Sequence, residues 1–205
     1  MTDTPLRFHQ KIFRACERYL GIHCYRIRLR PLDVTAPVVR PEHLDVRQAT
    51  ETELWSATAN PELGISREFL ADAIARGDKS YAAFDDGQIV AFTWRSTNAA
   101  PHQDGLRVSA SRPYIYGYKG FTLVSHRGMR LNIIVNDAAN ADSLQQGFTH
   151  MMGFVALHNA AKLANWRKHG FRTVGYAGYL RWFGSPVPFR TPSVSRTGFR
   201  FFRGE

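Results

Sequence analysis

Apolar residues recur along this chain with two different periods. Between residues 12 and 20 the spacing is helical, whereas residues 25–30 alternate Tyr, Ile and Leu with three arginines, the period-two pattern of a half-buried strand. An Asp-Gly pair at 86–87 predicts the turn of a hairpin. Beyond residue 43 the same reasoning predicts strands at 44–49, 112–125, 148–157 and 171–183, a hairpin at 79–95, and helices at 51–58, 66–77, 128–147 and 159–169.

The order of these elements predicts an α/β fold. A helix lies between the strands at 112–125 and 148–157, and a helix in that place favours a parallel pair within a mixed sheet. Residues 96–110 carry no clear period, so we expect an irregular loop there.

Length and charge divide the chain into three parts. Its 205 residues suffice for one domain with terminal extensions. We expect an N-terminal helix and arginine-rich strand extension at 1–43, a main domain at 44–183, and a basic tail rich in Pro, Arg and Phe at 184–205. Of the net charge of +10, residues 1–40 carry +5 and residues 181–205 carry +4. The nearly neutral middle argues against a basic groove, so nucleic acid is the least expected partner.

Each basic end allows two interpretations. The arginines within 26–30 either face water from an edge strand, or dock an acyl carrier protein or an anionic membrane surface. The tail is expected to be irregular, and it places Phe199, Phe201 and Phe202 beside arginines. These rings either enter a membrane interface, or pack on the domain or on a second subunit of a homodimer.

Several classes of protein are disfavoured by what the sequence lacks. It has no run of about 18 apolar residues and no secretory pattern at the N-terminus, so we expect a cytoplasmic protein. Cys16 and Cys24 by themselves form neither a disulfide scaffold nor a zinc site. The eight histidines show no ligand spacing, so no metal is expected.

The turn after the long strand carries the first candidate chemistry. A helix N-terminus offers unpaired backbone N–H groups and the positive end of its dipole, and both favour phosphate. Gly128 lets a ligand approach the backbone, and Arg127 and Arg130 can add charge-assisted hydrogen bonds. The pattern predicts a phosphate or pyrophosphate site, and an ordinary strand–turn–helix with solvated arginines is the alternative.

A second segment runs from Asn159 to Phe171, where Asn159 by itself is a good helix N-cap and Phe171 a core residue. Taken together and in this order, the two segments resemble the GNAT superfamily of acyl-CoA-dependent N-acyltransferases over about residues 44–183. In the family's loop pattern, Q/R-x-x-G-x-G/A, Arg127 takes the first position, and Gly128 takes the second position, where a glycine is common. The later pattern, N-x-x-(S/A)-x-x-x-(Y)-x-K-x-G-F, is matched at Asn159, Trp166, Lys168, Gly170 and Phe171.

Four positions depart from the family's patterns. Arg130 stands where the family has a glycine, Asn132 where it has a final Gly or Ala, and Lys162 where it has Ser or Ala. The side chain of Arg130 either obstructs the pyrophosphate or reaches a phosphate itself. Trp166 replaces a frequent tyrosine that protonates the departing thiolate, and an indole N–H donates a hydrogen bond without supplying a proton near pH 7.

The resemblance implies a mixed, mostly antiparallel central sheet with a parallel pair at a splay, where strands 114–123 and 148–157 diverge. It implies acyl transfer from acetyl-CoA or a longer acyl-CoA to a primary amine. Deprotonation of the amine needs a base or an ordered water, for which Tyr118 and His158 are the catalytic candidates, with packing and surface roles as their alternatives. The implied cofactor-binding residues are Phe121, Thr122 and Leu123 for pantetheine, Arg127, Gly128, Met129, Arg130, Leu131 and Asn132 for pyrophosphate, and Asn159 and Trp166.

Two stripes of side chains need an explanation. Asn132, Asn136 and Asn140 recur one helical turn apart, although asparagine is a poor residue for a helix interior. We interpret them as a solvated face. The tyrosines of residues 114–118 either line an acceptor pocket or belong to the core.

The sequence leaves the acceptor and the acyl chain length open, because the loops expected to bind the acceptor, 51–78 and 96–112, carry no motif. Two other functions stay open beside an N-acyltransferase, most simply an N-acetyltransferase. One is a GNAT-fold protein that binds acyl-CoA without turnover. The other is an acyltransferase whose donor is an acyl carrier protein.

Overall fold

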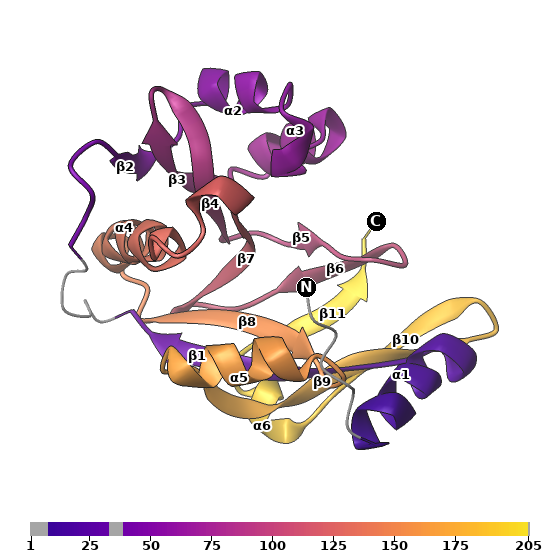
Figure 1. Ribbon diagram of the computed structural model, residues 1–205. Helices are drawn as coiled ribbons and strands as arrows, with labels where there is room; N and C mark the ends of the chain where they lie inside the picture. Colours follow the sequence, from indigo (N-terminus) through magenta and orange to yellow (C-terminus); the bar gives the residue numbers. More distant parts are fainter. Residues whose placement is uncertain (1–7, 33–38, 205) are drawn as a thin grey trace. The chain divides into compact units, whose positions relative to one another are not determined.

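The computed structural model describes residues 8–32 and 39–204 and divides into two compact units (Figure 1). Unit 1 comprises Met1–Arg30, Pro101–Arg112 and Met152–Glu205, and unit 2 comprises Pro31–Ala100 and Pro113–Met151. Within the ranges that are described, no helix is both long and apolar enough to cross a membrane.

Unit 2 is an antiparallel sheet covered by helices. Its strands lie in the order β7-β4-β3-β2, and each adjacent pair is antiparallel. The strands are β2 (Asp45–Gln48), β3 (Lys79–Asp85), β4 (Gln88–Ser96) and β7 (Tyr114–Thr122). The helices are α2 (Glu51–Ala57), α3 (Arg67–Ala75) and α4 (Leu131–Gln145), with short 3₁₀ turns η1 (Pro61–Leu63) and η2 (Val124–His126).

Local sequence explains where the elements of unit 2 begin and turn. Thr50 and Glu53 form a capping box at the start of α2, and the Ser66 side chain caps α3. Asp86 and Gly87 both adopt positive φ, 46° and 75°, as the predicted two-residue hairpin turn requires. The strands and helices predicted for this unit are confirmed, with boundaries shifted by up to three residues.

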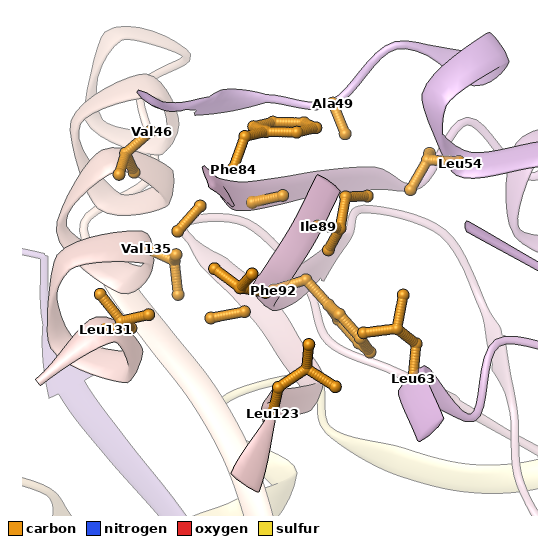
Figure 2. Packing of buried hydrophobic residues seen from close by; sticks show 14 of the residues in the cluster. Val46, Ala49, Leu54, Leu63, Phe84, Ile89, Phe92, Leu123, Leu131 and Val135 are labelled. Carbon is orange, nitrogen blue, oxygen red and sulfur yellow. The ribbon is translucent and has the colours of Figure 1, made fainter. Parts of the chain in front are cut away.

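The core of unit 2 lies on both faces of β4. Thr93 and Arg95 point toward α4, where both reach Asn136, whereas the Trp94 ring meets Phe69 of α3 edge-on at 5.3 Å. Figure 2 shows Leu131 and Val135 of α4 on one side of β4 and Leu63 on the other. Because α4 is anchored by buried Leu131, Ile134 and Val135, its first turn is held firmly against the sheet.

Unit 1 contains four further strands, in the order β10-β9-β1-β8, and a small three-stranded sheet in the order β11-β6-β5. The strands are β1 (Ile22–Pro31), β8 (His150–Ala156), β9 (Arg172–Trp182), β10 (Ser185–Arg190), β5 (Ala100–Pro101), β6 (Leu106–Ser109) and β11 (Arg200–Arg203). The helices are α1 (Phe8–Leu20), α5 (Ala160–Lys168) and α6 (Pro192–Ser195).

The arginine-rich strand β1 is central in its sheet, so the interpretation of an edge strand with arginines facing water is wrong. It pairs with β9 on one side and neighbours β8 on the other. Arg28 and Arg30 are buried, and Arg28 donates hydrogen bonds to the carbonyl oxygens of Leu163, at 2.8 Å, and Phe171. Alternation alone predicts one dry face, whereas here both faces of β1 are covered.

The tail and residues 96–110 are regular, contrary to expectation. The tail forms β10, α6 and β11, and β6 pairs with β11. Phe199 and Phe201 are buried, and the Phe201 ring lies 5.3 Å from Phe154 and 5.4 Å from Tyr25. Packing on the domain is therefore the correct interpretation for these two rings. The tail is regular despite its prolines, because a proline-rich segment can still pair as a short edge strand.

Candidate functional site

The turn between β7 and α4 leaves a run of backbone donors available. The Leu123 N–H bonds the Val90 carbonyl at 2.9 Å, which ends the strand pairing. In the described structure no protein acceptor is recorded for the N–H groups of residues 128–132, and the next donors, Ile133 and Ile134, both bond the Arg130 carbonyl at 2.8 and 3.3 Å. These donors stand at the positive end of a helix of 15 residues, where an anion is favoured.

The backbone of this turn keeps the conformation that glycine would adopt. Arg130 is the N-cap of α4 with φ 58° and ψ 20°, in the left-handed region, and its side chain caps no N–H group. That conformation costs a non-glycine residue about 1 kcal/mol. Gly128 also has positive φ, 89°, and a Cβ added there would meet nothing within 4 Å. The departure at Arg130 therefore leaves the path of the backbone intact.

The charges around the turn are arranged for an anion. Arg127 and Arg130 are exposed, and the side chain of neither has a hydrogen-bond or ion-pair partner among the residues that the structure describes. His126 instead binds Asp85 of β3, with 2.9 Å between Nε2 and Oδ2, which ties the turn to the β3–β4 hairpin. Two unpaired guanidinium groups beside a row of N–H donors are a suitable site for a phosphate or pyrophosphate group.

A bulge interrupts β7 just before this turn. Phe92 of β4 pairs with Phe121, and Trp94 pairs with Tyr118, so Thr93 stands opposite two residues, Lys119 and Gly120. Lys119 has φ 46°, a strained value for a residue with a side chain. Bulges disrupt the ladder locally and free backbone groups, which is why they are frequent near active sites.

Tyr118, one of the catalytic candidates, is bound within a polar cluster of unit 2. Its hydroxyl donates a 2.6 Å hydrogen bond to Oδ2 of Asp78, whose side chain is fully buried. Arg76 donates to the same Asp78 oxygen at 2.7 Å, and lies 3.4 Å from the Tyr118 oxygen. Burial and the Asp78 carboxylate raise the pKa of Tyr118, so the phenol keeps its proton at neutral pH.

Two of the three asparagines on α4 hold a buried cation, so the interpretation of a solvated face is wrong for Asn136 and Asn140, whereas Asn132 is exposed. The guanidinium of Arg95 donates to Oδ1 of Asn136 at 2.8 Å and to Oδ1 of Asn140 at 3.0 Å. Asn136 in turn donates to the backbone carbonyl of Asn132 at 2.6 Å. Arg95 is 2% exposed, so these side chains replace the water that a guanidinium otherwise needs. The ladder links the first turns of α4 to β4.

The candidates from the second segment lie in unit 1. Nδ1 of His158 is 2.9 Å from a carboxylate oxygen of Glu17. The Asn159 side chain accepts the Lys162 N–H at 3.0 Å and so caps α5, and the Trp166 ring stacks on Phe171 at 4.4 Å. Unit 2 thus brings Phe121–Asn132 together, and unit 1 brings together His158, Asn159 and Trp166.

Sequence reasoning missed Asp78, Arg95 and Glu17. Each is separated in sequence from its partner by 40 or more residues, as Tyr118–Asp78 and Arg95–Asn136 show. The only signal was indirect, since three asparagines on one helical face require a polar partner or water. Within the described ranges, no group of three or more His, Cys, Asp or Glu side chains is placed to hold a metal ion.

Comparison with known proteins identifies the fold. A scan against protein-family models finds no match, and a search of curated proteins finds none. Among solved structures, a GCN5-related N-acetyltransferase from Kribbella flavida is 15% identical with a TM-score of 0.52, and the match covers 88% of this chain and 63% of that one.

Two further structures agree. A GNAT-family protein from Novosphingobium aromaticivorans is 15% identical with a TM-score of 0.51, over 76% of this chain and 61% of that one. The aminoglycoside N-acetyltransferase AAC(6')-Iy in complex with CoA is 22% identical with a TM-score of 0.50, over 66% of this chain and 92% of that one. The matches thus span about three fifths of the first two structures. The chain has the fold of the GNAT N-acetyltransferases, and the expected α/β class with mostly antiparallel strands is confirmed.

Proposed function

We propose that this protein is an N-acyltransferase that moves an acyl group, most simply acetyl, from acyl-CoA to a primary amine. The observation that carries the proposal is the turn before α4. There, the free N–H groups of residues 128–132 and the unpaired Arg127 and Arg130 stand together in a GNAT fold. AAC(6')-Iy, which shares that fold, was solved with CoA.

The residues present fit the cofactor. The N–H groups of 128–132 would donate hydrogen bonds to the pyrophosphate oxygens, and the two arginines would neutralise their charge. The backbone at the β7 bulge, next to Phe121, Thr122 and Leu123, would hold the pantetheine and polarise the thioester carbonyl. The bound acyl-CoA supplies an activated acyl group, which a neutral amine attacks directly with loss of the CoA thiol.

The amine must lose a proton before or during attack, and in unit 1 the imidazole of His158 is a group able to accept one. An ionised carboxylate only accepts hydrogen bonds, so contact with Glu17 places the proton of His158 on Nδ1 and leaves the lone pair on Nε2. Tyr118 keeps its proton, so its hydroxyl can only order a water or the amine.

Trp166 favours a second function, acyl-CoA binding without turnover. Its indole is stacked on Phe171 and cannot protonate a thiolate near pH 7. Release of CoA thiol in the presence of any amine, followed with a thiol-reactive dye, excludes this alternative. Binding of acyl-CoA with no thiol release across an amine panel supports it.

The proposal is tested by calorimetric titration of the purified protein with acetyl-CoA and with octanoyl-CoA. We expect micromolar binding that weakens by tenfold or more in Arg127→Ala, because a charge-assisted contact to phosphate is lost. Arg40→Ala removes an exposed arginine elsewhere in unit 2 and is the matched control, with less than a twofold effect expected.

The preferred acyl chain length then selects the donor for a screen of amines. No heat with either ligand in a folded sample contradicts use of acyl-CoA. An acylated acyl carrier protein would then be titrated as the donor. Equal weakening by Arg127→Ala and Arg40→Ala would show general charge attraction rather than a site at the turn.

A further inference from the structure

Unit 1 contains a cavity that includes His158 in its lining. It has a volume of about 210 Å³ and is bounded by α1, the start of β1, the end of β8 and β10. The lining residues are Phe13, Cys16, Glu17, Ile22, Cys24, Leu157, His158 and Phe189. Six of these eight are apolar side chains or thiols, and the other two are Glu17 and His158.

The polar groups of the cavity are positioned by one another. One Glu17 oxygen binds Nδ1 of His158 at 2.9 Å, and the other binds Nδ1 of His23 at 3.2 Å. His23 is itself held by stacking on the buried ring of Tyr179 at 4.4 Å. The carboxylate is therefore fixed between two rings, with its charge beside the cavity, and it keeps lone pairs for a further donor.

These features select the chemistry of a ligand. A carboxylate and an imidazole lone pair both accept hydrogen bonds, so they suit a group that donates several, above all a primary ammonium. The rings of Phe13 and Phe189 suit an apolar body and can face a cation. The volume equals that of about seven water molecules, which fits a short chain or a single ring rather than an oligosaccharide or a nucleotide.

We propose that this cavity binds a compact primary amine with an apolar body, with its nitrogen at Glu17 and His158. A primary amine is also the acceptor class of the proposed function, and any role of the bound amine as acceptor rests on that proposal. Binding of the amine does not, because it requires no acyl-CoA.

The two cysteines allow a direct test. Cys16 and Cys24 are the only cysteines of the chain, and both line the cavity, so a thiol reagent reports on it alone. We would measure the rate of N-ethylmaleimide modification at pH 7 by mass spectrometry, with hexylamine as the ligand. Hexan-1-ol is the matched neutral probe. We expect saturable protection by hexylamine, and at least tenfold weaker protection by hexan-1-ol.

Glu17→Gln keeps the shape of the side chain and removes its charge. Relative to the variant's own rate without ligand, we expect hexylamine protection to weaken at least tenfold in Glu17→Gln, while Glu62→Gln in unit 2 leaves the protection unchanged. Should Glu17→Gln disturb folding, Phe189→Ala in the cavity lining provides the second variant, with weaker protection by both probes expected. Equal protection by amine and alcohol, or none by either, overturns the proposal.

The proposed function can fail separately. Protection by hexylamine without thiol release from any acyl-CoA leaves the amine site standing and removes its acceptor role. Thiol release with amines that give no protection leaves an acyltransferase whose acceptor binds elsewhere.

Discussion

The guanidinium of Arg95 donates a 2.8 Å hydrogen bond to Oδ1 of Asn136, across the interface between β4 and α4. The Asn136 side chain in turn donates a hydrogen bond to the backbone carbonyl of Asn132, in the first turn of α4. The same turn begins at Arg130, whose N–H is one of the donors of the candidate phosphate site. A buried cation in the core of unit 2 thus sets the position of the helix end that would bind the cofactor.

We expect Asn136→Ala to lower the free energy of unfolding by about 1–3 kcal/mol, because a buried guanidinium loses an acceptor. Asn136→Asp, which supplies a charged acceptor of the same shape, should restore most of that loss. Urea unfolding followed by fluorescence measures both. A loss below about 0.5 kcal/mol in Asn136→Ala would show that water already forms hydrogen bonds with the Arg95 guanidinium, contrary to its 2% exposure.

Arg130 offers a test of backbone strain. With φ at 58°, Arg130→Gly should raise the free energy of unfolding by about 1 kcal/mol, whereas Arg130→Ala should leave it nearly unchanged, since alanine suffers the same steric conflict. Both variants lose the guanidinium, so both should bind acetyl-CoA more weakly to a similar degree. Thermal unfolding separates the first effect and calorimetry the second. Equal stability of the two variants would contradict the left-handed conformation.

His102 makes unit 1 sensitive to acid. Burial lowers its pKa to about 4, and the nearby His23 contributes, while Asp104 opposes. The unfolded chain titrates near 6.5, so the stability is fully present above that pH and is lost as the pH falls from 6.5 toward 4. A shift of this size corresponds to roughly 3 kcal/mol.

Urea unfolding between pH 7 and pH 4.5 measures this loss. His102→Phe should flatten the dependence, because a phenyl ring fits among Tyr25, Phe154 and Phe201 without titrating. His43→Gln, at an exposed position, is the control and should keep the wild-type slope. The same slope in His102→Phe would assign the acid sensitivity to another group.

Tyr118→Phe distinguishes a hydrogen-bonding role from proton transfer. Asp78 loses one donor but keeps Arg76, so we expect a loss of about 1–2 kcal/mol in the free energy of unfolding. Turnover per folded molecule should fall less than tenfold, with the pH profile unmoved, because the pKa of Tyr118 is raised and the phenol never ionises. A loss of a hundredfold with a changed profile would make Tyr118 the proton acceptor.

The sequence by itself determined the elements whose signals are local. The Asp86-Gly87 turn and the strand over residues 25–30 depend on neighbours a few positions apart, and both formed as predicted. The turn at 127–132 and the order of strands and helices were enough to identify the fold by resemblance. Such local features can be predicted from the sequence because backbone geometry and capping act over a single turn.

Only the tertiary structure decided which polar side chains are buried and with what. Nothing near Arg28 in the sequence indicates that carbonyls of Leu163 and Phe171 will receive its hydrogen bonds, or that β1 will lie between two other strands. Likewise, Glu17 meets His158 from an element 141 positions away, and Arg95 converts an apparently solvated stripe into a buried network. The hydrophobic period shows which residues share a face of an element. Whether that face is buried or exposed depends on the elements that pack on it, and those contacts are made by residues distant in the chain.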